Sequence, residues 1–193
     1  EIFHSALQFD ISRLARGAPI RYAALILTGL EDERLDRSAT GVWEARWLAS
    51  GIDENWSRLN FQDIHNAPVV QSLLPPLGQA NLGPLAVNVF EFSPDQLTLL
   101  QQAVVNEQTR LSLRLDGPQA GGDNLFTWDS GYGPATRGNA PALLIVAGPP
   151  PATPPPVPTL DFIVVTSTPT PENVLTAAAI VQTSTALATQ VGT

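Results

Sequence analysis

The chain of 193 residues contains no cysteine and no methionine. Without cysteine it has no disulfides, no zinc–thiolate sites and no thiol nucleophile. Without methionine it is expected to be a processed form or a fragment whose signal peptide has been removed. No apolar run reaches the ~18 residues that a membrane span needs, so we expect no membrane span.

Lysine is also absent, and the ten basic residues are all arginines against 18 acidic ones. The formal net charge is -8 and the isoelectric point is about 4.5. An acidic chain repels phosphate backbones, which argues against a nucleic-acid partner. The lack of oxidisable cysteine and methionine suits an extracellular protein at the cell surface.

Proline is abundant, and nine of the 18 prolines lie after residue 148. The hydrophobic fraction of 44% is enough for a core. We therefore expect a folded domain over residues 1–148, a polyproline linker over 149–159, and a separate segment over 160–193. Residues 149–158 are expected to form a stiff polyproline II strut.

Apolar residues recur with a period of two through the first part, which is typical of β-strands. Ser93, Pro94 and Gln96 predict the start of one short helix, with a capping box. Residues 50–85 are expected to be an irregular loop held down by its own apolar side chains. The predicted fold is all-β, a jelly-roll-like antiparallel β-sandwich. The shared parity of the strands predicts a core that includes Phe9, Ile11, Ile26, Leu113, Leu115, Leu144 and Val146.

The last segment predicts a strand over Leu160–Thr168 and a helix that begins at Thr170-Pro171-Glu172. A solvated strand of this composition invites edge pairing. We expect it to pair with another copy of the chain. The predicted assembly residues are Leu160, Phe162, Ile163, Val164, Val165, Ile180, Leu187 and Val191.

The order of these elements resembles the DNRLRE family, secreted β-sandwich domains grouped with carbohydrate-binding modules. The resemblance covers roughly residues 3–147. Its segments are Leu7–Ser12 with Leu14, Ile20 and Ala23–Leu27, then Trp43–Asn60, Leu85–Phe92 with the helix, Leu111–Asp116 and Ala140–Val146.

Two departures from the family are visible. Its members usually have a further strand before the segment that matches Leu7–Ser12, and their middle region is shorter. Because this chain starts almost at that segment, the resemblance implies an open sheet edge beside Phe3–Ile11, and we expect the strand Leu160–Thr168 of another copy to pair there. The tail from Pro158 resembles Thr/Pro-rich stalks of surface proteins from filamentous green bacteria of the Chloroflexota type. The resemblance implies a secreted domain without catalytic residues.

Candidate catalytic residues are sparse. His4 and His65 are the only histidines, and no Gly-x-Ser-x-Gly elbow exists. Asp53, Glu54 and Asp63 flank Trp56, as a glycosidase site would require, but acidic loops commonly look the same. We expect no enzyme activity.

Two candidate ligand sites remain. Asp116, Asp123, Asn124 and Asp129 surround a glycine pair and are hard oxygen donors of the kind calcium prefers, although their spacing is not that of an EF-hand. Apart from calcium at these residues, we expect no cofactor. Trp43, Trp47, Trp56 and Trp128 are candidate sugar-stacking residues, of which at least two are expected in the core.

The sequence therefore favours a structural subunit that assembles with other copies of itself into a surface filament or sheath, by exchange of the strand and helix. The alternative is a carbohydrate-binding module on a Pro/Thr-rich stalk, whose partner is a cell-surface or matrix polysaccharide. That alternative requires aromatic faces exposed together on one concave surface.

Overall fold

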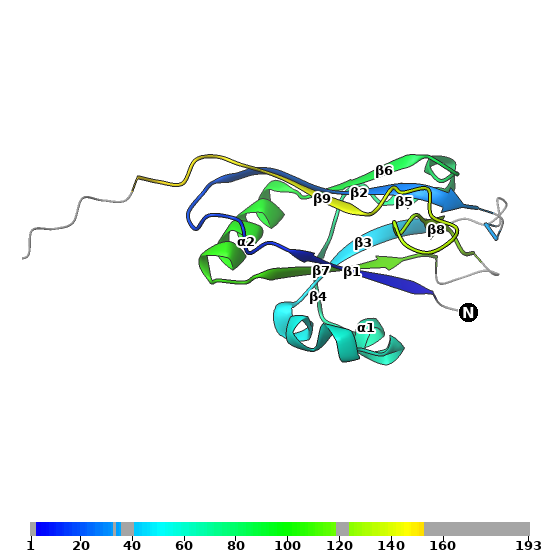
Figure 1. Ribbon diagram of the computed structural model, residues 1–193, viewed down its shortest axis with the longest axis horizontal. Helices are drawn as coiled ribbons and strands as arrows, with labels where there is room; N and C mark the ends of the chain where they lie inside the picture. Colours follow the sequence, from blue (N-terminus) through cyan, green and yellow to red (C-terminus); the bar gives the residue numbers. More distant parts are fainter. Residues whose placement is uncertain (1–2, 33, 36–40, 119–123, 153–193) are drawn as a thin grey trace, which may run out of the picture. The chain divides into compact units, whose positions relative to one another are not determined.

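The computed structural model describes residues 3–32, 34–35, 41–118 and 124–152. Two antiparallel sheets pack face to face in this part of the chain (Figure 1). The all-β sandwich predicted from the sequence is therefore confirmed. Residues 160–193, with all the predicted assembly residues, lie outside the described residues.

The first sheet contains β1 (His4–Asp10), β7 (Arg110–Asp116), β3 (Val42–Leu48) and β4 (Val69–Ser72), in that order. β5 (Leu77–Gly78) pairs with the start of β3. The alternation of leucine with polar residues in β7 sets its register, because only the leucines can face the core. β1 lies at one end of this sheet.

The second sheet is centred on β2 (Ile20–Glu31). β6 (Val87–Glu91) pairs with one side of β2, and β9 (Ala142–Ala147) pairs with the other. β8 (Thr127–Trp128) continues the side of β9 and pairs with β2 at Gly29 and Glu31. β9 and β6 are thus the two outer strands of this sheet.

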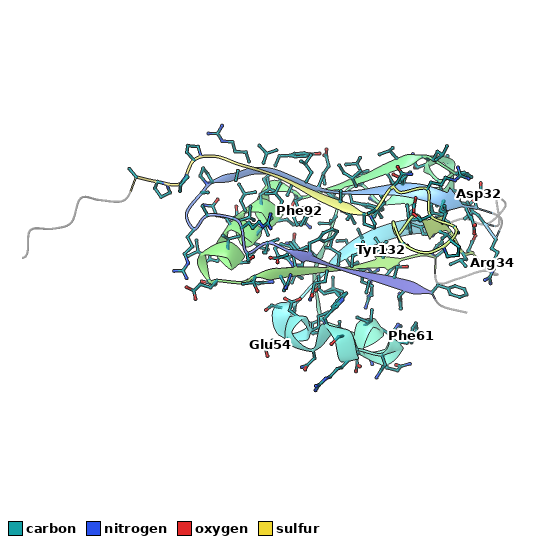
Figure 2. The ribbon with its side chains drawn as sticks, in the orientation of Figure 1. Asp32, Arg34, Glu54, Phe61, Phe92 and Tyr132 are labelled. Carbon is teal, nitrogen blue, oxygen red and sulfur yellow. The ribbon has the colours of Figure 1, made fainter. Side chains whose placement is uncertain are left out.

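Helix α2 (Pro94–Val105) begins where the sequence predicts, with the Ser93–Gln96 capping box formed. Residues 50–85 were expected to be irregular, and this expectation is wrong. They hold η1 (Ser50–Arg58), α1 (Phe61–Asn66), β4, β5 and η2 (Gln79–Asn81). Figure 2 shows Glu54 and Phe61 on this helical segment, on the outer side of the first sheet.

The core between the sheets includes Leu25, Phe90 and Trp43. Among the predicted core residues, Ile11, Leu113 and Leu115 are buried, and Phe9 packs against the core while half-buried. The prediction is wrong for three others. Leu144 and Val146 are each 45% exposed, and Ile26 is half-buried on the outer face.

The physical reason for this error lies in the sequences of β2 and β9. β9 reads Ala-Leu-Leu-Ile-Val-Ala, and Ala23–Leu27 of β2 is also apolar throughout. With no polar residue on either parity, the sequence does not say which face points inward. The structure places Leu143 and Ile145 against the core instead.

Candidate functional site

The two long sides of the sandwich differ. On the side of β6, Leu74 and Glu91 form a backbone bridge that joins the sheets, and the Leu74 N–H donates to the Glu91 carbonyl at 3.0 Å. On the opposite side, β1 pairs only with β7, and β9 only with β2, among the described residues. The sandwich is therefore open along β1 and β9. We call this opening the seam.

The seam is lined mainly by apolar side chains, with His4 and Asp129 also bordering one end and Asp10 and Arg13 the other. A pocket of about 310 Å³ lies at one end and is bordered by Leu7, Leu27, Phe126 and Pro141. A second pocket, of about 240 Å³, lies at the other end and is bordered by Phe9, Ile11, Leu14, Leu143 and Ile145.

β1 and β9 run in the same direction along the seam. The start of β1 shares the larger pocket with Pro141, the residue before β9. The end of β1 shares the smaller pocket with Leu143 and Ile145 of β9. Both strands run from right to left in Figure 1, and the chain leaves β9 at the smaller-pocket end.

An edge strand exposes backbone donors and acceptors that can pair with a further strand. The seam offers two such edges, with half-buried apolar side chains between them such as Leu7 and Leu143. An extended apolar segment can bond to either edge and cover these side chains. Within the described residues β1 is an edge strand, as the family resemblance implied for the region beside Phe3–Ile11.

A buried polar network covers the outer face of the first sheet beside the seam. The Asp116 carboxylate accepts two hydrogen bonds from the Arg114 guanidinium, at 2.8 and 3.0 Å, and lies 3.0 Å from Nε of Arg46. Arg114 also donates to the carbonyls of Ile64 and His65 at 2.7 Å. Arg114 therefore fastens α1 to β7.

Two histidines extend this network. Nδ1 of His4 lies 2.7 Å from the Asp116 carboxylate, and Nε2 of His4 lies 2.7 Å from Nδ1 of His65. The carboxylate favours a proton on Nδ1 of His4, which leaves Nε2 to accept from His65. His4 also stacks on Phe61, with ring centroids 5.3 Å apart. This geometry suits an uncharged His4.

The stability of the domain is expected to fall as the pH drops below about 6.5. Burial lowers the pKa of His4 from its ordinary value of 6.5 and outweighs the nearby Asp116, which raises it. As the pH falls, His4 therefore binds a proton at a higher pH in the unfolded chain than in the folded chain. The stabilisation is present above pH 6.5 and is lost as the pH falls through the lower folded pKa.

Urea denaturation between pH 7.5 and 5.5 measures this effect. His4→Gln should reduce the slope of the free energy of unfolding against pH in this range, because the titrating group is gone. An unchanged slope in His4→Gln would contradict the assignment to His4.

The candidate calcium ligands do not share one site among the described residues. Asp116 is engaged by arginines, whereas Asp129 accepts hydrogen bonds from the Thr136 hydroxyl and from the N–H groups of Gly131, Arg137 and Asn139. The bond from Thr136 is the main reason that the pKa of Asp129 lies far below its ordinary value. Asn124 is buried, and Asp123 lies outside the described residues.

The four candidate sugar-binding tryptophans do not form one surface. Trp43 and Trp47 are 2% and 4% exposed, so a sugar has no access to their rings. Trp56 is half-buried on η1, and Trp128 is half-buried on β8 of the other sheet. The expectation that at least two of the four belong to the core is confirmed.

Two of the acidic residues near Trp56 have structural roles. The Asp53 carboxylate accepts a hydrogen bond from the Ser112 hydroxyl at 2.5 Å and longer ones from Gln8 and Gln108. These bonds tie η1 to β1 and β7. The Asp63 carboxylate accepts from the Asn60 N–H and caps α1.

Sequence reasoning missed the network around Asp116. Ser112, Arg114 and Asp116 alternate with leucines in β7, which is typical of a solvated face, yet all three are buried. The only local indication of this network in the sequence was the spacing of Arg114 and Asp116, which lie two residues apart on one face of the strand.

No family model, curated protein or solved structure matches this chain. Within the described residues, no helix is long and apolar enough to cross a membrane.

Proposed function

We propose that this protein is a non-enzymatic structural subunit that assembles with copies of itself outside the cell. In this proposal the seam of one copy accepts the apolar segment Leu160–Thr168 of the next. The observation that carries the proposal is the seam itself, a mainly apolar opening between two unpaired edges in the described part of the domain.

The composition of Leu160–Thr168 supports this use. It alternates Phe162, Val164 and Thr166 with Ile163, Val165 and Ser167, so either parity presents β-branched or aromatic side chains to a core. Its only charged residue is Asp161, near one end. Such a strand gains main-chain hydrogen bonds from a sheet edge and burial of its side chains from the seam.

The proline-rich stretch supports exchange between copies. Residues 149–158 span about 30 Å as polyproline II at ~3.1 Å per residue. Proline-rich linkers act as semi-rigid, extended spacers, which favours donation to a neighbour. Head-to-tail donation generates an open polymer, the filament or sheath that the sequence favours.

The alternative, a carbohydrate-binding module of the kind that the DNRLRE resemblance implies, has less support. It needs at least two aromatic faces on one surface, and two of the four tryptophans are buried in the core.

A charge placed in the seam is expected to abolish assembly. Leu143→Glu puts a carboxylate between the sheet edges, where a donated strand would bury it at high cost. The domain should still fold, because Leu143 is only half-buried. Sedimentation velocity and negative-stain microscopy of the full chain should show polymers for the wild type and monomers for this variant.

Leu99→Glu is the matched control, because Leu99 on α2 is a leucine that is already 41% exposed. It should assemble like the wild type. Equal assembly of the two variants would refute the seam as the acceptor. A full chain that stays monomeric and binds a polysaccharide would favour the carbohydrate-binding alternative.

A further inference from the structure

The outer faces of the two sheets are covered unequally. η1 and α1 pack over the outer face of the first sheet, where Arg114, Ser112 and Asp116 are buried beneath them. The outer face of the second sheet remains open in the described part of the chain: Val87 is 64% exposed, and Leu144 and Val146 are each 45% exposed.

This open face is mainly apolar on each of its three main strands. The register pairs Tyr22 with Val146, and it places Ile26 of β2 beside Val89 of β6. Glu91, which lies beside Ala24, is the one charged residue in the registered pairs of β2 with β6 and β9, and it accepts a hydrogen bond from the Tyr22 hydroxyl at 2.9 Å. A solvated face of an antiparallel sheet normally carries polar residues, so the composition fits a covered face.

The sequence of residues 171–193 predicts a helix with an apolar stripe, which suits packing against this apolar sheet face. One stripe of the predicted helix carries Val174, Ile180, Val181, Leu187 and Val191, and Glu172 is its only charged residue. An isolated helix of this length is marginal in water and gains most of its stability from packing. A helix laid on a sheet face is the common way for both to bury their apolar surfaces.

We infer that the outer face of β9, β2 and β6 binds the helix of residues 171–193 from a second copy of this chain. This inference rests on the proposed function. A strand donated along β9 extends the second sheet at the edge of this face, and Pro169 and Thr170 then lead directly into the helix. The strand and the helix of one donor thus dock on the same acceptor, one in the seam and one over the adjoining face.

The absence of cysteine allows a direct test by disulfide trapping in the full chain. Val146→Cys on one preparation and Leu187→Cys on another are mixed, assembled and oxidised. Only a contact between copies can yield the mixed disulfide. Docking should produce it about tenfold faster than the control pair, Val70→Cys with Leu187→Cys, because docking raises the local thiol concentration. Val70 is 40% exposed on β4 of the other sheet.

A second pair, Leu143→Cys with Val164→Cys, reports on the seam separately. Trapping of both the seam pair and the Val146–Leu187 pair supports the helix site. Trapping of the seam pair alone overturns the helix site and leaves the donated strand standing. Failure of the seam pair overturns the proposed function itself. If Val146 and Leu187 cross-link only when both cysteines are in one chain, the helix docks within its own copy and the inference is wrong.

Discussion

A chain shortened to residues 1–159 is expected to remain monomeric at concentrations where the full chain polymerises. The shortened chain retains the compact unit that ends at Ala152, so its fold should survive. It loses the strand that we propose fills the seam, and with it the only donor. Sedimentation velocity should show one monomeric species, and negative-stain microscopy should show no polymers.

A substitution control separates loss of the strand from loss of length. This control is a variant of the full chain with serine at five positions of the strand: Phe162, Ile163, Val164, Val165 and Thr166. This variant keeps the linker and the helix, yet it should also fail to assemble. Polymers identical to the wild type in either variant would show that assembly does not use the strand.

Replacing Asp116 by alanine is expected to lower the free energy of unfolding by about 3–5 kcal/mol. The Arg114 side chain is 5% exposed and the Asp116 side chain 3%. Removing the carboxylate leaves the Arg114 charge buried without its ionic partner and leaves Nδ1 of His4 without its acceptor. Guanidinium denaturation followed by tryptophan fluorescence measures the loss.

Asp10→Ala is the control for this second experiment. Asp10 forms an ion pair with Arg110 at 3.0 Å, but both side chains are about half exposed, and solvent-exposed pairs contribute little. Asp10→Ala should therefore unfold at nearly the same guanidinium concentration as the wild type. Comparable losses in both variants would mean that burial does not strengthen the Asp116 network.

The elements that the sequence predicted well are those with a local physical cause. α2 begins at Ser93 because its capping box lies within four residues, and β7 keeps its register because leucines alternate with polar residues. β9 lacks such an alternation, so its orientation depends on its pairing with β2, which is a contact across more than a hundred residues.

The seam was predictable only in part. The open edge at β1 was implied by the family resemblance, whose members have a further strand at this point, but the second open edge at β9 follows from the sheet topology of the described residues. The cover over the first sheet was not predictable, because Arg114 reaches the carbonyls of Ile64 and His65 only once the chain has folded.

The common direction of β1 and β9 fixes what symmetry strand donation can produce. A donated strand is parallel to both edges of the seam or antiparallel to both. The chain leaves β9 at the smaller-pocket end. If the linker continues straight and the neighbouring copy has the same orientation as the donor, the donated strand runs parallel to β1 and β9 of that neighbour. Such a polymer is polar, with a free tail at one end and an empty seam at the other. An antiparallel strand requires an inverted neighbour, whose own tail can return to the first copy and close a twofold dimer.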